Sequence, residues 1–252
     1  MGDVYIVAEQ LAGALSDDTF ELLAHGKALA GQTGGNLTAV LLGGDPALAG
    51  QLGAASKVIT VDCGADFNPE SYGAALQAVV SADSPQVVML SNSAMGMDLA
   101  ASLAAQADLP LAAYCHSIDY AGGFTAVSQL YGGKLDITAQ LGDGPCVVTM
   151  LAGSASADAG RATGSPPTEA VAAPAVAGKI RFKQLNMPEA GDVDITNKDI
   201  LVAIGRGIGS KDDIEVAEEL AEALNAAVAA SRPIIDAGWL PGPGRWANRG
   251  LR

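Results

Sequence analysis

The chain has 252 residues, of which 49% are hydrophobic, and it carries a formal net charge of −14 at pH 7. This is enough for one large or two modest domains with a buried core, while the acidic excess argues against nucleic acid or an anionic membrane as a partner. No apolar stretch is long enough to span a bilayer and no basic signal-peptide region begins the chain, so we expect a cytoplasmic protein.

Short apolar runs alternate with helical patterns up to Asp119. These runs are apolar on both faces, which is typical of a parallel sheet covered by helices. The repeated strand–helix order implies right-handed crossovers. Strands are predicted at 4–8, 36–43, 57–61, 87–91 and 111–115, and helices at 17–30, 71–82 and 96–107.

The pattern changes after Asp119, where strands are predicted at 125–130, 135–141 and 145–151 without long helices between them. We expect these three strands to form an antiparallel extension of the sheet. Residues 153–178 are rich in Ala, Gly, Ser and Pro, a composition typical of a flexible linker. Residues 179–185 then alternate as a strand does.

Cysteines and histidines are few in this chain. Cys63, Cys115 and Cys146 lie far apart and form no CxxC pair, so we expect reduced thiols. His25 and His116 have no partner at the spacing of metal ligands, and we expect His25 on the surface of a helix. We therefore expect no metal site.

A second strand–turn–helix unit begins near residue 200. A buried strand is predicted at 200–204 and an amphipathic helix at 212–226. Between them stand Gly205, Arg206 and Gly207; glycines let the backbone approach a phosphate closely, and the arginine adds a positive charge. The GxGxxG fingerprint is absent, so a tight turn with an exposed arginine is an equal alternative. The helix residues expected on one apolar side are Ile214, Val216, Ala217, Leu220 and Leu224.

Ser231 and Arg232 follow the next short apolar run. Ligands of open α/β sheets bind beyond the carboxyl ends of the strands, and this rule places Arg206 and Arg232 on the same rim. An arginine at one strand end is more often a surface charge. Two arginines at consecutive strand ends favour a binding site.

The segment from Ile204 to Pro241, IGRGIGSKDDIEVAEELAEALNAAVAASRPIIDAGWLP, closely resembles the signature of electron-transfer flavoprotein alpha subunits. GRG, the helix, ASRP and DAGWLP occur in the family's order. The first half resembles the family's first domain less specifically, through VYIVAE, LTAVLLG, VVMLSNSAMGMDLAASLAA and YGGK. The resemblance covers nearly the whole chain up to Pro241 and weighs against a nucleotide-binding stress or signalling domain.

The resemblance implies an α/β fold in two parts, a parallel-sheet, nucleotide-binding-like domain over 1–185 and the start of an α/β FAD-binding domain over 186–252. It also implies a heterodimer with a beta subunit. Electrons would pass from acyl-CoA or other dehydrogenases, as in fatty acid β-oxidation, to a quinone-linked acceptor. The protein would then be a redox carrier rather than a substrate-converting enzyme.

Carried over residue by residue, the resemblance assigns the cofactor contacts to the second domain. Arg206 would contact the FAD pyrophosphate between Gly205 and Gly207, and Ser231 would also touch the cofactor. Arg232 would lie near the isoalloxazine ring, where a cation stabilises the negative charge of reduced flavin. The flavin does the chemistry, so no catalytic base or nucleophile is needed.

The resemblance stops after Pro241, where the family continues with a glycine loop of the form QVG(K/Q)(S/T)G. A gene segment encoding RQVGKSGLTV that loses one base can read GRWANRGLR, which is Gly244 to Arg252, followed by a stop. We therefore hypothesise a frameshift, with a divergent natural tail as the alternative. FAD binding would then be impaired, and Ile234, Ile235 and Trp239 would lack covering layers. The alternative function is a flavin-free remnant that folds its first domain or only pairs with the beta subunit.

Overall fold

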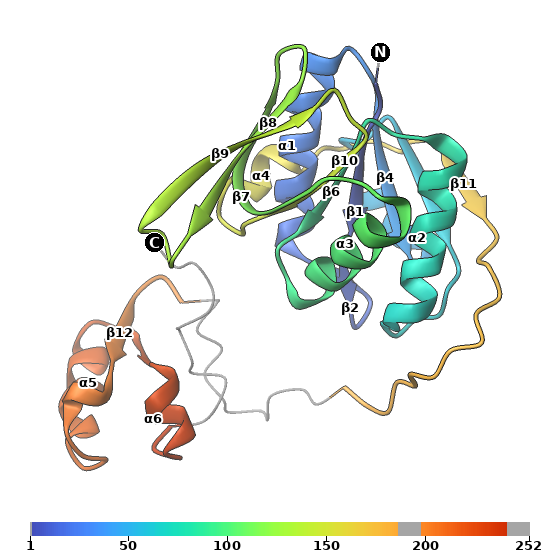
Figure 1. Cartoon of the computed structure of the whole chain (residues 1–252). Coiled ribbons are helices and arrows are strands. Elements are labelled where there is room, and N and C mark those ends of the chain that lie inside the picture. Colours follow the sequence, from blue (N-terminus) through green and yellow to red (C-terminus); the bar gives the residue numbers. More distant parts are fainter. Residues whose placement is uncertain (1, 186–197, 241–252) are drawn as a thin grey trace. The chain divides into compact units, whose positions relative to one another are not determined.

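The computed structural model describes residues 2–185 and 198–240. The chain divides into two compact units, Met1–Phe182 and Lys183–Arg252 (Figure 1). Both units are mixed α/β, and the first contains a large, mostly parallel sheet, as the sequence predicts. The frameshift hypothesis falls on residues 241–252, outside the described part of the chain.

The first unit is built on a nine-stranded sheet in the order β11-β5-β4-β1-β6-β10-β7-β8-β9. All neighbours from β11 to β7 are parallel, and β8 is antiparallel to its two neighbours, β7 and β9. A small antiparallel pair, β2 and β3, follows β1. The strands are β1 Val4–Ala8, β2 Gln10–Leu11, β3 Ala14–Leu15, β4 Leu37–Leu42, β5 Lys57–Val61, β6 Val87–Ser91, β7 Leu111–Tyr120, β8 Phe124–Leu130, β9 Leu135–Gly142, β10 Cys146–Met150 and β11 Thr168–Val171.

Helices cover both faces of the parallel part of this sheet (Figure 1). α1 (Asp17–Thr33) and the 3-10 turn η1 (Pro46–Gln51) pack on one face, and α2 (Pro69–Asp83) and α3 (Ala94–Ala107) pack on the other. Every residue of β1, β4, β6 and β10 is buried. The continuous apolar runs of the sequence therefore correspond to strands with a hydrophobic layer on each side.

The predicted antiparallel extension is correct for two strands and wrong for the third. β8 and β9 continue the sheet beyond β7 and are joined by a turn at Tyr131–Lys134. β10 instead lies between β6 and β7 and is parallel to both. The burial of all its side chains explains the difference, since only an interior strand needs apolar residues on both faces.

The segment predicted to be a flexible linker, 153–178, is partly ordered structure in the first unit. Its first part forms the short helix α4 (Ala157–Gly160) beside α1, where the Arg161 guanidinium pairs with Asp17 and lies 3.9 Å from the centre of the Phe20 ring. Its second part contributes β11, which pairs with β5 at the sheet edge. A proline-rich composition disfavours interior structure but permits an edge strand.

The chain after β11 is held on the first turn of α2, and it is not the strand predicted at 179–185. One Glu70 carboxylate oxygen accepts hydrogen bonds from the backbone N–H groups of Lys179 (2.7 Å) and Ile180 (2.9 Å). Asn68 donates to the Ile180 carbonyl oxygen at 2.9 Å. These side chains provide hydrogen-bond partners for backbone groups that would otherwise pair with a neighbouring strand. We call residues 153–182 the belt.

The second unit contains two parallel strands, β12 (Leu201–Ile204) and β13 (Ala227–Ala230), among its described residues. They are connected by the 3-10 turn η3 (Arg206–Ile208) and by α5 (Ile214–Ala223), and α6 (Arg232–Asp236) follows β13. The core contains Ile204, Ile214 and Ile234. Contrary to expectation, Ile234 is buried, and Ile235 and Trp239 pack against this core.

The apolar face of α5 differs from the predicted one. Ile214, Ala217 and Ala221 are buried against the strands. Val216, Leu220 and Leu224, which were expected on the same side, are exposed by 67%, 50% and 47%. These three residues are four apart and form a stripe next to the buried one. A single pair of strands is too narrow to cover both stripes.

Candidate functional site

The first part of the candidate site is the loop that leaves β12. Gly205 has an extended backbone, and η3 begins at Arg206, whose side chain is exposed. Ile208 donates its N–H to the Gly205 carbonyl oxygen at 3.0 Å and packs against the core. Gly209 has φ +95°, a conformation that favours glycine. The loop is thus shaped by Ile208 and Gly209, which leaves Arg206 on the outside.

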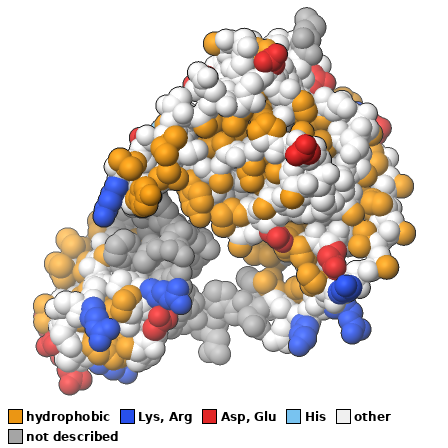
Figure 2. Space-filling view, in the orientation of Figure 1, with side chains coloured by type: hydrophobic (Ala, Val, Ile, Leu, Met, Phe, Trp, Pro, Cys, Tyr) orange, Lys and Arg blue, Asp and Glu red, His pale blue; other side chains and the backbone are white. Residues whose placement is uncertain are grey.

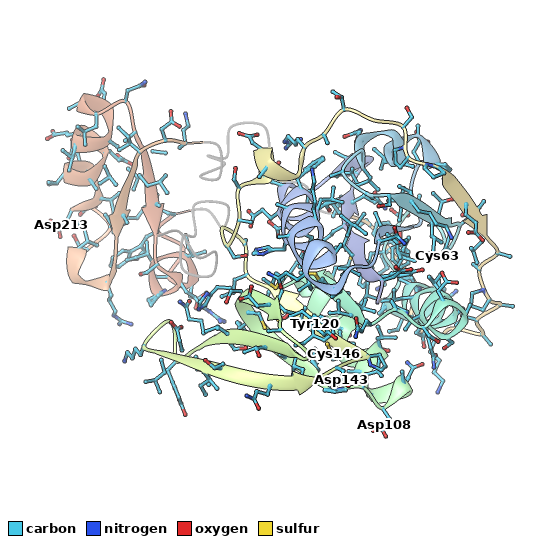
Figure 3. All side chains as sticks on the ribbon, turned by 90° about the horizontal axis from the view of Figure 1, so that it is seen from above. Cys63, Asp108, Tyr120, Asp143, Cys146 and Asp213 are labelled. Atoms are coloured by element: carbon cyan, nitrogen blue, oxygen red, sulfur yellow. The ribbon has the colours of Figure 1, made fainter. Side chains whose placement is uncertain are left out.

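A reciprocal pair of hydrogen bonds fixes the other end of this loop at the start of α5. The Ser210 hydroxyl and backbone N–H donate to Asp213 Oδ2 at 2.7 and 3.1 Å (Figure 3 labels Asp213). The Asp213 N–H in turn points to Ser210 Oγ at 3.4 Å. This arrangement resembles a capping box placed just before α5, with the acidic side chain of Asp213 at the N-cap position. The loop that carries Arg206 is therefore anchored at both ends.

The second part of the site is the end of β13. The Ser231 N–H donates to the Ile204 carbonyl oxygen at 2.9 Å, so the carboxyl ends of the two strands lie side by side. A Cβ atom placed on Gly205 would lie 3.8 Å from Ser231 Oγ. Ser231 precedes α6, yet its hydroxyl makes no capping hydrogen bond. The structure therefore brings Gly205 and Ser231 together. Arg206 and Arg232 are the next residues along the chain.

The two arginines differ in their surroundings. Arg232 is exposed, and its Nε lies 3.2 Å from Asp236 Oδ2, four residues further along α6. In the described part of the chain, Arg206 has no carboxylate within ion-pairing distance. Sequence reasoning did not predict the contact with Asp236. The four-residue spacing of an arginine and an aspartate on one helical turn could have indicated it.

These residues fit an anionic, phosphate-bearing cofactor. Two guanidinium groups and an uncommitted hydroxyl lie at neighbouring strand ends, where open α/β sheets bind ligands. Among the described residues, apart from the two chain neighbours of Gly207, no atom lies within 4 Å of the position that a Cβ would take there. The bare backbone there leaves room for a bound group, and the same chemistry suits the pyrophosphate of FAD.

The first unit offers no comparable space at its own switch point. The strand order reverses at β1, because β4 and β5 follow on one side of it and β6 lies on the other, and ligands of open sheets commonly bind at such a point. The cavity there measures about 10 Å³, room for about one water molecule. Burial raises the pKa of Glu9, whose carboxylate accepts a hydrogen bond from Ser93 at 2.6 Å. The cavity is too small for a nucleotide, which weighs against the hypothesis of a nucleotide-binding stress or signalling domain.

Other reactive side chains serve packing. Cys63, Cys115 and Cys146 are free thiols, and burial raises the pKa of Cys146 to about 12, so this thiol stays protonated. His25, expected on the surface, is half-buried, with Nε2 3.0 Å from Ser154 Oγ. Across residues 2–185 and 198–240, no cluster of His, Cys, Asp or Glu is arranged to hold a metal ion. Within the same ranges, no helix is long and apolar enough to cross a membrane.

Comparison with known proteins agrees with this geometry. The family model of the electron transfer flavoprotein domain matches residues 4–176 of the sequence. The family model of the electron transfer flavoprotein FAD-binding domain matches residues 194–244. The chain belongs to the electron transfer flavoprotein family and is an alpha subunit. The resemblance seen in the sequence is thereby confirmed, and the family's role as an electron carrier applies to this chain.

Three relatives illustrate the extent of the similarity. The electron transfer flavoprotein subunit alpha of Methylophilus methylotrophus is 29% identical, over 96% of this chain and 77% of the relative. That of Clostridium acetobutylicum is 32% identical, over 94% of this chain and 74% of the relative. The acryloyl-CoA reductase electron transfer subunit beta of Anaerotignum propionicum is 29% identical, over 95% and 76%.

Proposed function

We propose that the second unit binds FAD at the joined ends of β12 and β13. The Ser231-to-Ile204 hydrogen bond carries this proposal, because it aligns the two strand ends that bear Arg206 and Arg232. Arg206 binds the pyrophosphate, with close backbone approach at Gly205 and Gly207. Arg232 lies near the flavin ring. The flavin, when bound, takes up and releases electrons, and the chain holds it and sets its electrostatic surroundings.

The test is the visible flavin spectrum of the chain purified together with its beta subunit. We expect a yellow complex. Arg206→Ala is expected to lower FAD affinity by about tenfold, since it removes charge-assisted hydrogen bonds. Lys211→Ala, which removes another cation from the same loop, is the matched control and should change the affinity by less than about twofold. A colourless complex, or equal losses in both variants, would contradict the proposal.

We propose that this chain alone retains FAD weakly. The described part of the second unit has one pair of strands, and the α5 stripe of Val216, Leu220 and Leu224 is exposed. A small sheet with an uncovered helix face offers a cofactor little rigid support. A version extended with the C-terminal segment of a longer relative should hold FAD more tightly. Equal flavin content in both versions would contradict weak retention.

We propose that the partner is the family's beta subunit and that it binds the β8–β9 extension. Among the described strands, β9 is an edge strand with one unpaired side, and large apolar side chains are exposed around it (Figure 2). An exposed apolar edge of this kind is typical of a protein interface. The residues concerned are Tyr131, Leu135 and Ile137, with exposed fractions of 76%, 54% and 46%.

Co-purification tests this surface. Ile137→Lys should abolish capture of the beta subunit while the far-UV circular dichroism of the chain stays unchanged. Val216→Lys places the same charge on the other exposed apolar stripe, on α5, and should leave capture intact. The opposite result would place the partner on α5.

We further propose that the complex works in the cytoplasm between acyl-CoA or other dehydrogenases and a quinone-linked acceptor. Family membership supports the electron carrier role, and the acidic surface suits docking on basic protein patches. Mixing the complex with a substrate-reduced acyl-CoA dehydrogenase should bleach the flavin absorbance of the complex. No bleaching with that enzyme, but bleaching with another dehydrogenase, would change the donor and keep the carrier role.

A further inference from the structure

The ion pair between Arg232 and Asp236 lies on a rigid single turn. Ile234, between them in sequence, is 1% exposed and holds α6 in the core of the second unit. Backbone hydrogen bonds from Ile234 to Ser231 (3.0 Å) and from Ala237 to Pro233 (3.2 Å) close the turn. Both charged side chains are therefore presented from a fixed backbone, at the end of β13.

The contribution of this pair to folding is small. The two side chains are exposed by 68% and 62%, and exposed pairs at this helical spacing contribute little to the free energy of unfolding. The pair matters more for what it does to Arg232. Asp236 engages Nε and leaves the two terminal nitrogens as donors, and its negative charge offsets that of the guanidinium.

We infer that Asp236 is a positioning residue that fixes the guanidinium of Arg232 and, by offsetting its charge, lowers the reduction potential of the bound flavin. This inference rests on the proposed FAD site. A cation near the ring favours reduced flavin, so a carboxylate on that cation makes reduction less favourable. Arg206, which lacks such a partner among the described residues, keeps its full charge for the pyrophosphate.

The experiment measures the flavin potential in the complex with the beta subunit. Asp236→Asn keeps an oxygen that can accept from Arg232 Nε but removes the charge. We expect it to bind reduced flavin, relative to oxidised flavin, about tenfold more tightly, which corresponds to about +30 mV for a two-electron couple. Asp236→Glu should restore the original potential. Glu222→Gln on α5 removes the same charge elsewhere in the unit and should leave the potential unchanged.

A second background separates action through Arg232 from a direct effect of the charge on the flavin. In Arg232→Met, adding Asp236→Asn should produce less than half of the original shift. An undiminished shift of the potential in the Arg232→Met background, or no shift in Asp236→Asn alone, overturns the inference. The proposed FAD site still stands in that case, provided that the complex is yellow. A colourless wild-type complex overturns the proposed FAD site and this inference with it. Equal loss of flavin in the Asn and Glu variants, with an unchanged potential, would show a merely structural role.

Discussion

The two units differ in how much packed structure surrounds the ends of their strands. In the first unit, the parallel part of a nine-stranded sheet lies between two helical layers, and the cavity at the switch point holds about one water molecule. In the second, two described strands bear two exposed arginines, an uncommitted serine hydroxyl and bare glycine backbone. Packing and cofactor chemistry are thus placed in different parts of the chain. The first unit contains the larger packed core, and the second exposes the charged groups that we propose bind FAD.

A leucine-to-alanine substitution in each unit should show the largest contrast, measured as the loss in the free energy of unfolding. Leu76 on α2 is fully buried. Because Leu76→Ala leaves a cavity there, we expect it to lower the free energy of unfolding by about 3 kcal/mol. Leu220→Ala on the half-exposed stripe of α5 should cost less than about 0.5 kcal/mol. Urea denaturation followed by circular dichroism measures both. Equal costs would mean that the α5 stripe is covered in the folded chain, and the contrast between the units would fail.

Two glycines, one at the contact between the belt and α1 and one on the exposed side of α1, should change stability in opposite directions when replaced by alanine. A Cβ at Gly160 would lie 1.8 Å from the Phe20 carbonyl oxygen on α1, so Gly160→Ala must push α4 away, at a cost of about 1–3 kcal/mol. Gly31 is exposed within α1, and apart from the adjacent helix backbone no atom of the described residues lies within 4 Å of its Cβ position. Gly31→Ala should stabilise the unit by up to about 1 kcal/mol. Thermal unfolding of both variants tests whether the belt belongs to the packed part of the first unit.

The parallel sheet could be predicted from the sequence because its strands are buried on both faces. β1, β5 and β6 begin and end where the apolar runs do. The order of the strands could not be read in the same way. β10 carries the same kind of apolar run as β6, and nothing local shows that it inserts between β6 and β7. The belt was missed for a related reason, since β11 and α4 are ordered by contacts with β5 and α1 rather than by their own sequence.

The candidate site was predictable to the extent that it depends on chain order. Gly205 and Ser231 follow consecutive parallel strands, so their proximity follows from the topology alone. The neighbours of each arginine depend on side-chain geometry. The contact of Arg232 with Asp236 and the Ser210–Asp213 cap required the structure. The face of α5 was misjudged because helical periodicity gives the position of a stripe but not the width of the sheet that covers it.

A smaller effect is expected where the belt reaches α2. Glu70→Gln weakens the charge-assisted hydrogen bonds to the N–H groups of Lys179 and Ile180, with a local cost of about 1 kcal/mol. The chain should then open there more often, and trypsin should cleave after Lys179 or Arg181 faster than in the wild type. Glu218→Gln, which removes the same charge from α5, is the control. Unchanged cleavage in Glu70→Gln would show that the Glu70 hydrogen bonds do not hold this end of the belt.

The smallest effect should come from His25 and depends on pH. Burial lowers the pKa of His25 from 6.5, and the charge of Asp119 opposes this only in part. The folded state therefore favours neutral histidine, and stability should fall as the pH drops through 6.5, where the unfolded chain takes up the proton. His25→Gln can keep the contact with Ser154 and should lose this dependence. Burial raises the pKa of Glu9 and Glu21, which acts in the opposite direction at lower pH, but these groups are the same in both proteins. The difference in urea midpoint between wild type and variant at pH 7.5 and at pH 5.5 thus isolates His25, and parallel pH profiles would contradict its burial against the belt.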